Sequence, residues 1–396
     1  MNHRLHMESE MKEKFLVFGA PDIGEEEIRE VVDSLKSGWL GTGPKVARFE
    51  RDFAVYKGVR ETRVAAVNSC TAALHISMIA AGLRPGDEVI TTPMTFAATI
   101  NAIIHSGAKP VLADVDPKTM NIDPDGIEPA ITERTRAILP VHMAGRPCEM
   151  DAIMQIAERH DLVVIEDCAH AIETEYRGRK AGTFGNFGCF SFYVTKNVIT
   201  GEGGMIVARK EGDVARAKQL ALHGMSKDAW RRFSDAGYKH YFVVESGFKY
   251  NMMDIQAAIG IHQLKRVEKN WENRRRIWNY YQSALEPFPI TRPPEPEPGT
   301  RHAYHLYTIL VDEKRCGISR DAFLDAMTQQ NIGVGVHYMS IPEHPFYQKA
   351  FGWKPEMYPN AMTIGRQTVS LPLSPKLSPH EIDNVVAAIG RCLEKT

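Results

Sequence analysis

The segment VAAVNSCTAALHISMIAAG, residues 64–82, decides the fold class. It opens with small and β-branched residues that favour a strand, continues through a polar turn at Asn68–Cys70, and ends as an apolar helical run at Gly82. The same order of strand, turn and helix returns in DEVITTPMTFAATINAIIHSG, residues 87–107. Strands that alternate with helices are typical of crossover units and of a largely parallel sheet.

The pattern extends outward from these two units, from residue 45 to about residue 210. Helical spacing is found in KVARFERDFAVYKG (45–58) and DAIMQIAERH (151–160). Further strands are predicted at KPVLADVD (109–116), RAILPVH (136–142), LVVIED (162–167) and GCFSFYV (188–194), with a hairpin arm at GEGGMIVA (201–208). We therefore expect an α/β protein with a mostly parallel central sheet sandwiched by helices.

A second, smaller unit is expected after this sheet. The pattern is helical over residues 255–287, long enough to connect two domains, and FPITRPPEPEPGT (288–300) carries too many prolines for anything but a loop. Segments HLYTILVD and VGVHYM then suggest a small α/β unit. We predict a flexible tail over residues 1–14, a large domain over 15–260 and a small domain with the long helix over 261–396.

Composition excludes several classes of protein. The chain has 396 residues, 48 Lys plus Arg and 49 Asp plus Glu, so its net charge of −1 gives no global attraction to nucleic acid. No apolar run reaches the roughly 20 residues of a membrane span, and the charged N-terminus does not resemble a secretory signal. We predict a cytoplasmic protein that binds neither nucleic acid nor membrane.

The six cysteines lie scattered, without a CxxC pair or a His partner at metal-ligand spacing. Buried free thiols are the simplest interpretation, and no metal site is expected. His142, His160 and His170 show no hydrolytic metal motif either.

Four turns that follow predicted strands carry candidate chemistry, because open α/β sheets bind ligands at the carboxyl ends of their strands. At Asn68–Ala73, hydroxyls and helix N-terminal amides suit a phosphate, although Ser69 as a plain N-cap explains the motif equally. Asp167 ends an apolar strand and needs a partner, either a cationic ligand nitrogen or the next element, which it would cap.

The other two turns surround a lysine and precede the long helix. Lys196 follows bulky apolar residues and precedes the Gly-rich turn 201–204, where desolvation would lower its pKa and free a nucleophilic amine. A solvated surface lysine is the alternative. In GFKYNMMD (247–254), Asn251 or Asp254 could simply cap the following helix.

Together these segments resemble the DegT/DnrJ/EryC1/StrS family of sugar aminotransferases, which use pyridoxal 5′-phosphate (PLP) on an aspartate aminotransferase-like fold (fold type I). The resemblance runs through nearly the whole chain, and its motifs are GWLGTGPKVARFE (38–50), NSCTAALH (68–75), PMTFAATINAI (93–103), PVHMAGRPCEMDAI (140–153), EDCAHA (166–171), FSFYVTKNVITGEGGM (190–205), GFKYNMMDIQAAIG (247–260), HAYHLY (302–307) and SLPL (370–373).

The resemblance implies a role for each matching residue. Lys196 would bind PLP covalently and shuttle the proton, with pyridoxamine phosphate as the intermediate form, and Asp167 would keep the pyridine nitrogen protonated. The other implied cofactor contacts are Ser69, Cys70, Thr71 and Ala72 at the phosphate, Ser191 as a second phosphate contact, Phe96 stacked on the ring, His170 near the ring, and Asn251 toward the cofactor of the neighbouring subunit in a homodimer.

Three positions refine what the resemblance implies. Tyr193 stands where family members commonly have His or a small residue, and Cys70 replaces the more frequent Gly of the phosphate turn. A relative with His at the lysine position acts as a deoxysugar dehydratase, so Lys196 favours transamination.

The implied reaction moves an amino group from L-glutamate to a keto sugar linked to a nucleoside diphosphate, UDP or dTDP, giving an amino sugar for surface polysaccharide, glycan or antibiotic synthesis. HGMSKDAWRRF (223–233) resembles relatives that aminate C4 of the sugar. The candidate sugar contacts are His223, Trp230, Arg231, His337 and Tyr338. The alternatives are another PLP reaction on this fold, such as 3-keto or non-nucleotide sugar amination or dehydratase-like chemistry, and a non-catalytic regulatory protein.

Overall fold

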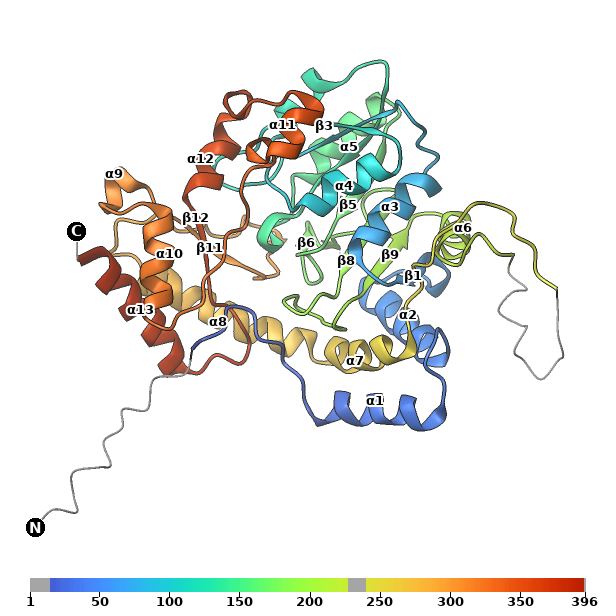
Figure 1. The fold of residues 1–396 in the computed structure, drawn as a ribbon, viewed down its shortest axis with the longest axis horizontal. Coiled ribbons are helices and arrows are strands. Elements are labelled where there is room, and N and C mark those ends of the chain that lie inside the picture. Colours follow the sequence, from blue (N-terminus) through green and yellow to red (C-terminus); the bar gives the residue numbers. More distant parts are fainter. Residues whose placement is uncertain (1–14, 227–239, 395–396) are drawn as a thin grey trace, which may run out of the picture.

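The computed structural model describes residues 15–226 and 240–394, so the predicted tail at residues 1–14 lies outside the described chain. Its centre is a seven-stranded sheet in the order β1-β9-β8-β5-β4-β2-β3 (Figure 1). All neighbouring pairs are parallel except those made by β9, which runs antiparallel to β1 and β8. The strands are β1 Val64–Val67, β2 Glu88–Thr91, β3 Lys109–Leu112, β4 Thr135–Leu139, β5 Val163–Asp167, β8 Phe187–Ser191 and β9 Gly204–Ala208.

Helices cover both faces of this sheet, as the alternating sequence pattern predicts. Ala65 and Val67 of β1 pack with the helices of one face, and Val64 and Ala66 pack with those of the other. The first face is covered by α3 Cys70–Ala80, α4 Ala97–His105 and α6 Glu211–Ala221. The second face is covered by α2 Pro44–Lys57, α5 Met150–Arg159 and α7 Asp254–Lys265. The predicted α/β class with a mainly parallel sheet is confirmed.

The predicted helical stretch 255–287 is two helices rather than one. Helix α7 ends at Lys265, and α8 runs over Val267–Ala284, with Arg266 out of helical geometry at φ −104° and ψ 7°. Arg266 also donates to the carbonyl of Asp22 at 2.7 Å and pairs with Glu27 at 2.5 Å, which ties the break to helix α1 Glu25–Ser37. The two helices run almost in line, with α1 beside α7 (Figure 1).

The C-terminal part has its own apolar core around a two-stranded antiparallel sheet of β11 Tyr307–Leu310 and β12 Thr368–Leu371. Helix α8 contributes Trp278 and Tyr281 to that core, together with α10 Arg320–Gln329 and α13 Pro379–Glu394. Its remaining helices are α9 Glu313–Cys316, α11 Pro345–Phe351 and α12 Pro359–Gln367. The division into a large domain over 15–260 and a small domain over 261–396 stays a prediction.

Short elements complete the described chain. A small sheet joins β10 Thr300–Arg301, β6 Glu175–Tyr176 and β7 Arg179–Lys180. The 3-10 helices are Glu61–Arg63, Pro124–Gly126, Glu128–Ala130, Met143–Gly145, Ile341–Glu343 and Pro355–Met357. The proline-rich segment 288–299 forms neither helix nor strand, as predicted, apart from one bridge between Thr291 and Leu310. Among the described residues, no helix combines the length and the apolar character needed to cross a bilayer.

Candidate active site

A cavity of about 510 Å³ opens where β5 and β8 end and where α3 and α4 begin. This is the edge of the sheet at which the sequence places its ligand site, because crossover units bring strand ends and helix starts together there. The lining residues are Ser69, Cys70, Thr71, Leu74, Thr95, Phe96, Ala98, Val141, Asp167, Ala169, His170, Ser191, Tyr193, Thr195, Lys196, Glu202, Gly203, His337 and Tyr338.

One end of the cavity is built by the first turn of α3. The Ser69 hydroxyl accepts the N–H of Ala72 at 3.1 Å, so Ser69 is the N-cap of the helix as well as a cavity residue. Cys70 and Thr71 are the first helical residues, and their N–H groups have no carbonyl within the helix to bond. Gly204 of β9 lies against this turn so closely that an added Cβ would be 2.5 Å from the carbonyl carbon of Ser69. The result is a tight, electropositive end suited to an anion.

Asp167 occupies the cavity wall at the end of β5, with its side chain buried. Its Oδ1 accepts the N–H of Ala169 at 3.0 Å, and its Oδ2 accepts the hydroxyl of Thr99 at 2.8 Å. Burial raises the pKa of the Asp167 carboxyl, while these two donors and the positive charge of Lys196 oppose the rise. Such a carboxylate is most stable when a cation faces it.

Lys196 lies in a turn just after β8, where its N–H donates to the carbonyl of Tyr193 at 2.9 Å. Its side chain lines the cavity together with Asp167 and Ser191. Burial lowers the pKa of the Lys196 amine to about 8, so a larger fraction of the amine is unprotonated near neutral pH than for an exposed lysine. The solvated-surface alternative is therefore wrong for this lysine.

His170 and Tyr338 form a hydrogen-bonded pair at the cavity wall. The N–H of Ala144 donates to His170 Nδ1 at 3.3 Å, so the ring proton sits on Nε2, which lies 3.1 Å from the Tyr338 hydroxyl. Burial keeps the pKa of His170 well below its ordinary value, so the ring is neutral. The Tyr338 hydroxyl accepts from His170 and keeps its own proton for another acceptor. Phe96, which is 60% exposed, tilts against Tyr338 with ring centroids 5.7 Å apart.

The cavity brings together most of the residues predicted from the sequence. They are Ser69, Cys70, Thr71, Phe96, Asp167, His170, Ser191, Lys196, His337 and Tyr338. Ala72 stands behind the lining, with its N–H engaged by Ser69. Exposed His223 follows α6 and is not among the lining residues, and Trp230 and Arg231 lie outside the described residues.

Neither Asn251 nor Asp254 is the N-cap of α7, which is Met253. Asp254 caps α2 instead, because its carboxylate accepts the N–H groups of Gly43 at 2.8 Å, Lys45 at 3.1 Å and Val46 at 2.9 Å. Asn251 lies beside β1 and donates to the Thr42 hydroxyl at 2.6 Å, and its buried Oδ1 has no partner among the described residues. Asn251 does not line the cavity of this chain.

Sequence reasoning missed Thr95 and Thr99, although a signal was present. They are four residues apart around the start of α4, which places them on the same side of a helix. Their hydroxyl oxygens are 2.6 Å apart, and Thr99 donates onward to Asp167. Glu202 and Thr195 also line the cavity and were not singled out.

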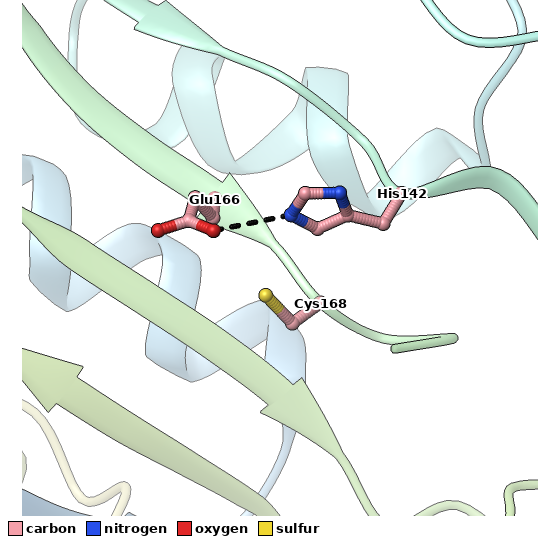
Figure 2. Close-up of side chains that lie close together, drawn as sticks. All are labelled: His142, Glu166 and Cys168. Carbon is pink, nitrogen blue, oxygen red and sulfur yellow. Dashed lines mark hydrogen bonds and ion pairs between the residues drawn. The ribbon is translucent and has the colours of Figure 1, made fainter. Parts of the chain in front are cut away.

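A second group of buried polar side chains is formed by His142, Glu166 and Cys168, next to the end of β5 (Figure 2). His142 Nδ1 accepts the N–H of Cys148 at 3.1 Å, so its Nε2 carries the proton that Glu166 accepts at 3.1 Å. Glu166 also accepts three backbone N–H groups, from Gly182 at 2.7 Å and from Phe184 and Gly185 at 2.8 Å. Both ring nitrogens and both carboxylate oxygens are therefore engaged in hydrogen bonds, and this group fixes the end of β5 rather than presenting free ligand atoms.

Comparison with known proteins identifies the family. The family model described as "DegT/DnrJ/EryC1/StrS aminotransferase family" matches residues 21–390. The chain is 48% identical over 376 residues to the spore coat polysaccharide biosynthesis protein SpsC of Bacillus subtilis, covering 95% of this chain and 96% of that protein.

Solved structures agree with the sequence matches. The putative sugar aminotransferase Spr1654 of Streptococcus pneumoniae, in its PLP form, matches with a TM-score of 0.89 and 32% identity over 96% of this chain and 99% of that chain. Helicobacter pylori PseC, an aminotransferase involved in the biosynthesis of pseudoaminic acid, matches with a TM-score of 0.88 and 27% identity over 97% of this chain and 100% of that chain. The chain therefore belongs to the DegT/DnrJ/EryC1/StrS aminotransferase family and is a PLP-dependent enzyme of the aminotransferase fold.

Proposed function

We propose that this enzyme holds PLP covalently on Lys196 and transfers the amino group of L-glutamate to a nucleotide-linked keto sugar. The observation that carries the proposal is one cavity that combines the N-terminus of α3, the carboxylate of Asp167 and the amine of Lys196. These three groups match the three chemical features of PLP, which are its phosphate, its pyridine nitrogen and its aldehyde.

The cavity fits the cofactor at each of these points. Cys70 and Thr71 offer N–H groups to a phosphate, and Gly204 keeps the strand behind them close. Asp167 is a buried carboxylate whose raised pKa calls for a positive partner, which a protonated pyridine nitrogen supplies. Phe96 and Tyr338 add aromatic surface beside the space where a flat ring would lie. Bound PLP supplies the electron sink that makes amino transfer possible.

Lys196 is the proposed acid and base of the reaction. Its pKa of about 8 lets the released amine take a proton from the carbon next to the substrate nitrogen and return a proton at the next position. Thr99 and Ala169 hold the Asp167 carboxylate in the cavity wall, where it would pair with a protonated ring nitrogen. The hydroxyl of Tyr338 has a free proton to donate toward an oxygen of the substrate or the cofactor.

The sugar substrate is inferred from relatives and from the sequence. The name of SpsC places that protein in spore coat polysaccharide synthesis, and Spr1654 is described as a putative sugar aminotransferase. These names support a sugar substrate, and the segment 223–233, which resembles relatives that aminate C4, is the basis for proposing a nucleotide-linked 4-keto sugar and a 4-amino product. His337 and Tyr338 are the described candidates for contacts to that sugar.

The assembly and location are part of the same proposal. We propose a cytoplasmic homodimer in which Asn251 reaches the phosphate of the neighbouring subunit's cofactor. Its support is the placement of Asn251 outside this chain's own cavity, with a buried Oδ1 that has no partner among the described residues.

The experiment is a two-stage incubation of the purified enzyme. The PLP-loaded protein is first treated with L-glutamate, and both the pyridoxamine form and 2-oxoglutarate are measured. The aminated protein is then freed of donor and mixed with UDP-linked and dTDP-linked 4-keto sugars, and sugar products are followed by mass spectrometry. We expect an amino sugar from one nucleotide series. Conversion of the cofactor without any aminated sugar would contradict the proposed 4-keto sugar substrate. No conversion with L-glutamate would contradict L-glutamate as the amino donor.

A further inference from the structure

A buried ion pair lies behind the cavity, on the far side of the Lys196 turn. Glu173, in the loop after β5, pairs with Arg274 of α8, and their side chains are 0% and 2% exposed. Burying two charges costs more than an ordinary pair returns, so such a pair is weak evidence for stability alone. Its location suggests a role in the reaction, because Glu173 also accepts a hydrogen bond from Asn197, the residue that follows Lys196.

That link is the side chain of Asn197. Its Nδ2 donates to Glu173 Oε2 at 2.8 Å and to the carbonyl of Ala303 at 3.0 Å. Both partners are acceptors, so the orientation of the amide is fixed and its Oδ1 points the other way. Asn197 is thereby anchored on two sides, and the backbone of Lys196 is anchored next to it.

The Oδ1 of Asn197 in turn fixes a histidine. It lies 3.0 Å from Nδ1 of His305, so this ring nitrogen must carry the proton. The His305 ring packs on the His170 ring, with centroids 4.4 Å apart. His170 is the cavity residue that donates to Tyr338. The chain of contacts from Glu173 therefore reaches the cavity at two places, at Lys196 through the backbone and at His170 through the tilted ring of His305.

We propose that Glu173, held by Arg274, is a positioning residue of amino transfer, which acts through Asn197 on Lys196 and through His305 on His170. Arg274 belongs to α8, the helix that also carries Trp278 and Tyr281 of the C-terminal core. The pair thus couples the Lys196 turn to the packing of the C-terminal part. The inference rests on the proposed function where it is tested by kinetics with L-glutamate. Its other test, hydrogen exchange, needs only the apoprotein.

The test compares three variants with the wild-type enzyme. Glu173→Leu combined with Arg274→Met removes the charges together, so no single charge is left buried, and it also removes the acceptor of Asn197 Nδ2. Asn197→Ala removes the side chain that joins Glu173 to His305 and leaves the Glu173–Arg274 ion pair intact. This variant keeps the proposal testable if the double variant does not fold. Glu88→Gln is the matched control, because Glu88 is also buried and paired with Arg134 at 2.9 Å but lies at the opposite, amino end of β2.

Hydrogen exchange of the apoprotein gives the first readout. We expect the segments 192–200 and 302–307 to exchange faster in the double variant and in Asn197→Ala, and to stay as in the wild type in Glu88→Gln. Unchanged exchange of these segments in Asn197→Ala, or an equal increase in Glu88→Gln, would overturn the proposal.

Kinetics of the PLP-loaded enzyme give the second readout. We expect kcat with L-glutamate to fall by roughly tenfold to a hundredfold in the double variant and in Asn197→Ala, with KM almost unchanged, because misplacing the reacting amine costs rate rather than binding. A kcat equal to that of the wild type in Asn197→Ala would overturn the positioning role. A wild-type enzyme inactive with glutamate would count against the proposed function, while the exchange data would still decide whether the contacts hold the Lys196 turn.

Discussion

At the scale of single residues, burial lowers the pKa of two lysines within residues 15–226 and 240–394, and their geometry distinguishes them. Burial lowers the pKa of Lys57 to about 7 and that of Lys196 to about 8. The Lys57 amine donates to the carbonyls of Ile172 and Ala181, both at 2.9 Å, and does not line the cavity. Of these two lysines, Lys196 is the one that lines the cavity together with Asp167. A lowered pKa alone therefore does not identify a catalytic lysine.

The pKa of Lys196 predicts how capture of PLP depends on pH. Schiff-base formation needs the unprotonated amine, and the fraction of that form rises through pH 8 rather than through the ordinary range near 10.5. We expect the rate at which the apoprotein takes up PLP to increase with pH, with a midpoint near 8. Stopped-flow absorbance at constant ionic strength measures this rate. A rate that keeps rising above pH 10 would show that Lys196 has the pKa of an exposed lysine.

We expect the Asp167 carboxylate to lower the stability of the apoprotein and to be needed for activity. Its pKa is raised by burial, so its contribution to stability is present at low pH and is lost as the pH rises through the pKa of the folded state. Burial disfavours the ionised form of this carboxyl in the folded apoprotein, and Asp167→Asn removes that cost. We expect apo Asp167→Asn to be more stable by about 0.5–2 kcal/mol and nearly inactive. Chemical denaturation and turnover, measured on the same preparation, test both halves; a destabilised apoprotein would contradict the first.

At the scale of elements, helix starts and strand ends build the cavity, and the sequence predicts these parts well. Local patterns alone place Ser69 between a strand and a helix, Asp167 at the end of a strand and Lys196 in the turn after a strand. Asp254 is different, because it caps α2 across more than 200 residues of chain. The break between α7 and α8 is also not predictable locally, since neither Gly nor Pro marks Arg266 and its partners, Asp22 and Glu27, lie on a distant segment.

The start of α4 carries a prediction of its own through Thr99. Its hydroxyl is a donor to Asp167, so Thr99→Val leaves that oxygen without one partner and raises the pKa of the carboxyl further. We expect PLP to bind more weakly by about 1–3 kcal/mol. Thr99→Ser, which keeps the hydroxyl, is the control and should bind PLP nearly as the wild type does. Titration of each apoprotein with PLP, followed by absorbance, measures the affinity; equal affinities for Val and Ser would rule out a role for the hydroxyl.

At the scale of the whole molecule, long-range contacts join the C-terminal helices to the sheet domain. Apolar residues of α4, including Ile100, pack with Tyr347 of α11 and Ile364 of α12 in one cluster. Composition and periodicity predict the two cores, but they do not show how the cores meet. The network of Glu173, Asn197 and His305 was missed for the same reason, because its hydrogen-bonded partners lie 24 and 108 residues apart.

The contact at Asp114 tests how strongly the C-terminal part is joined to the sheet. Its carboxylate, just beyond β3, accepts the N–H groups of Asn360 and Ala361 at 3.0 Å, in the first turn of α12. Asp114→Ala leaves both donors without this partner, and we expect a loss of about 1–3 kcal/mol. Scanning calorimetry should show a lower transition temperature, with α12 released before the sheet domain. An unchanged transition would mean that the apolar cluster alone holds the two parts together.

The most direct test of the central claim is to trap the cofactor on the protein. The PLP-loaded enzyme is reduced with borohydride and digested, and the modified lysine is located by mass spectrometry. We predict a single phosphopyridoxyl group on Lys196, lost in Lys196→Ala and unaffected by Lys57→Met. A stable modification at Lys57 or at another lysine, with Lys196 unmodified, would contradict the assignment of this cavity as the cofactor site.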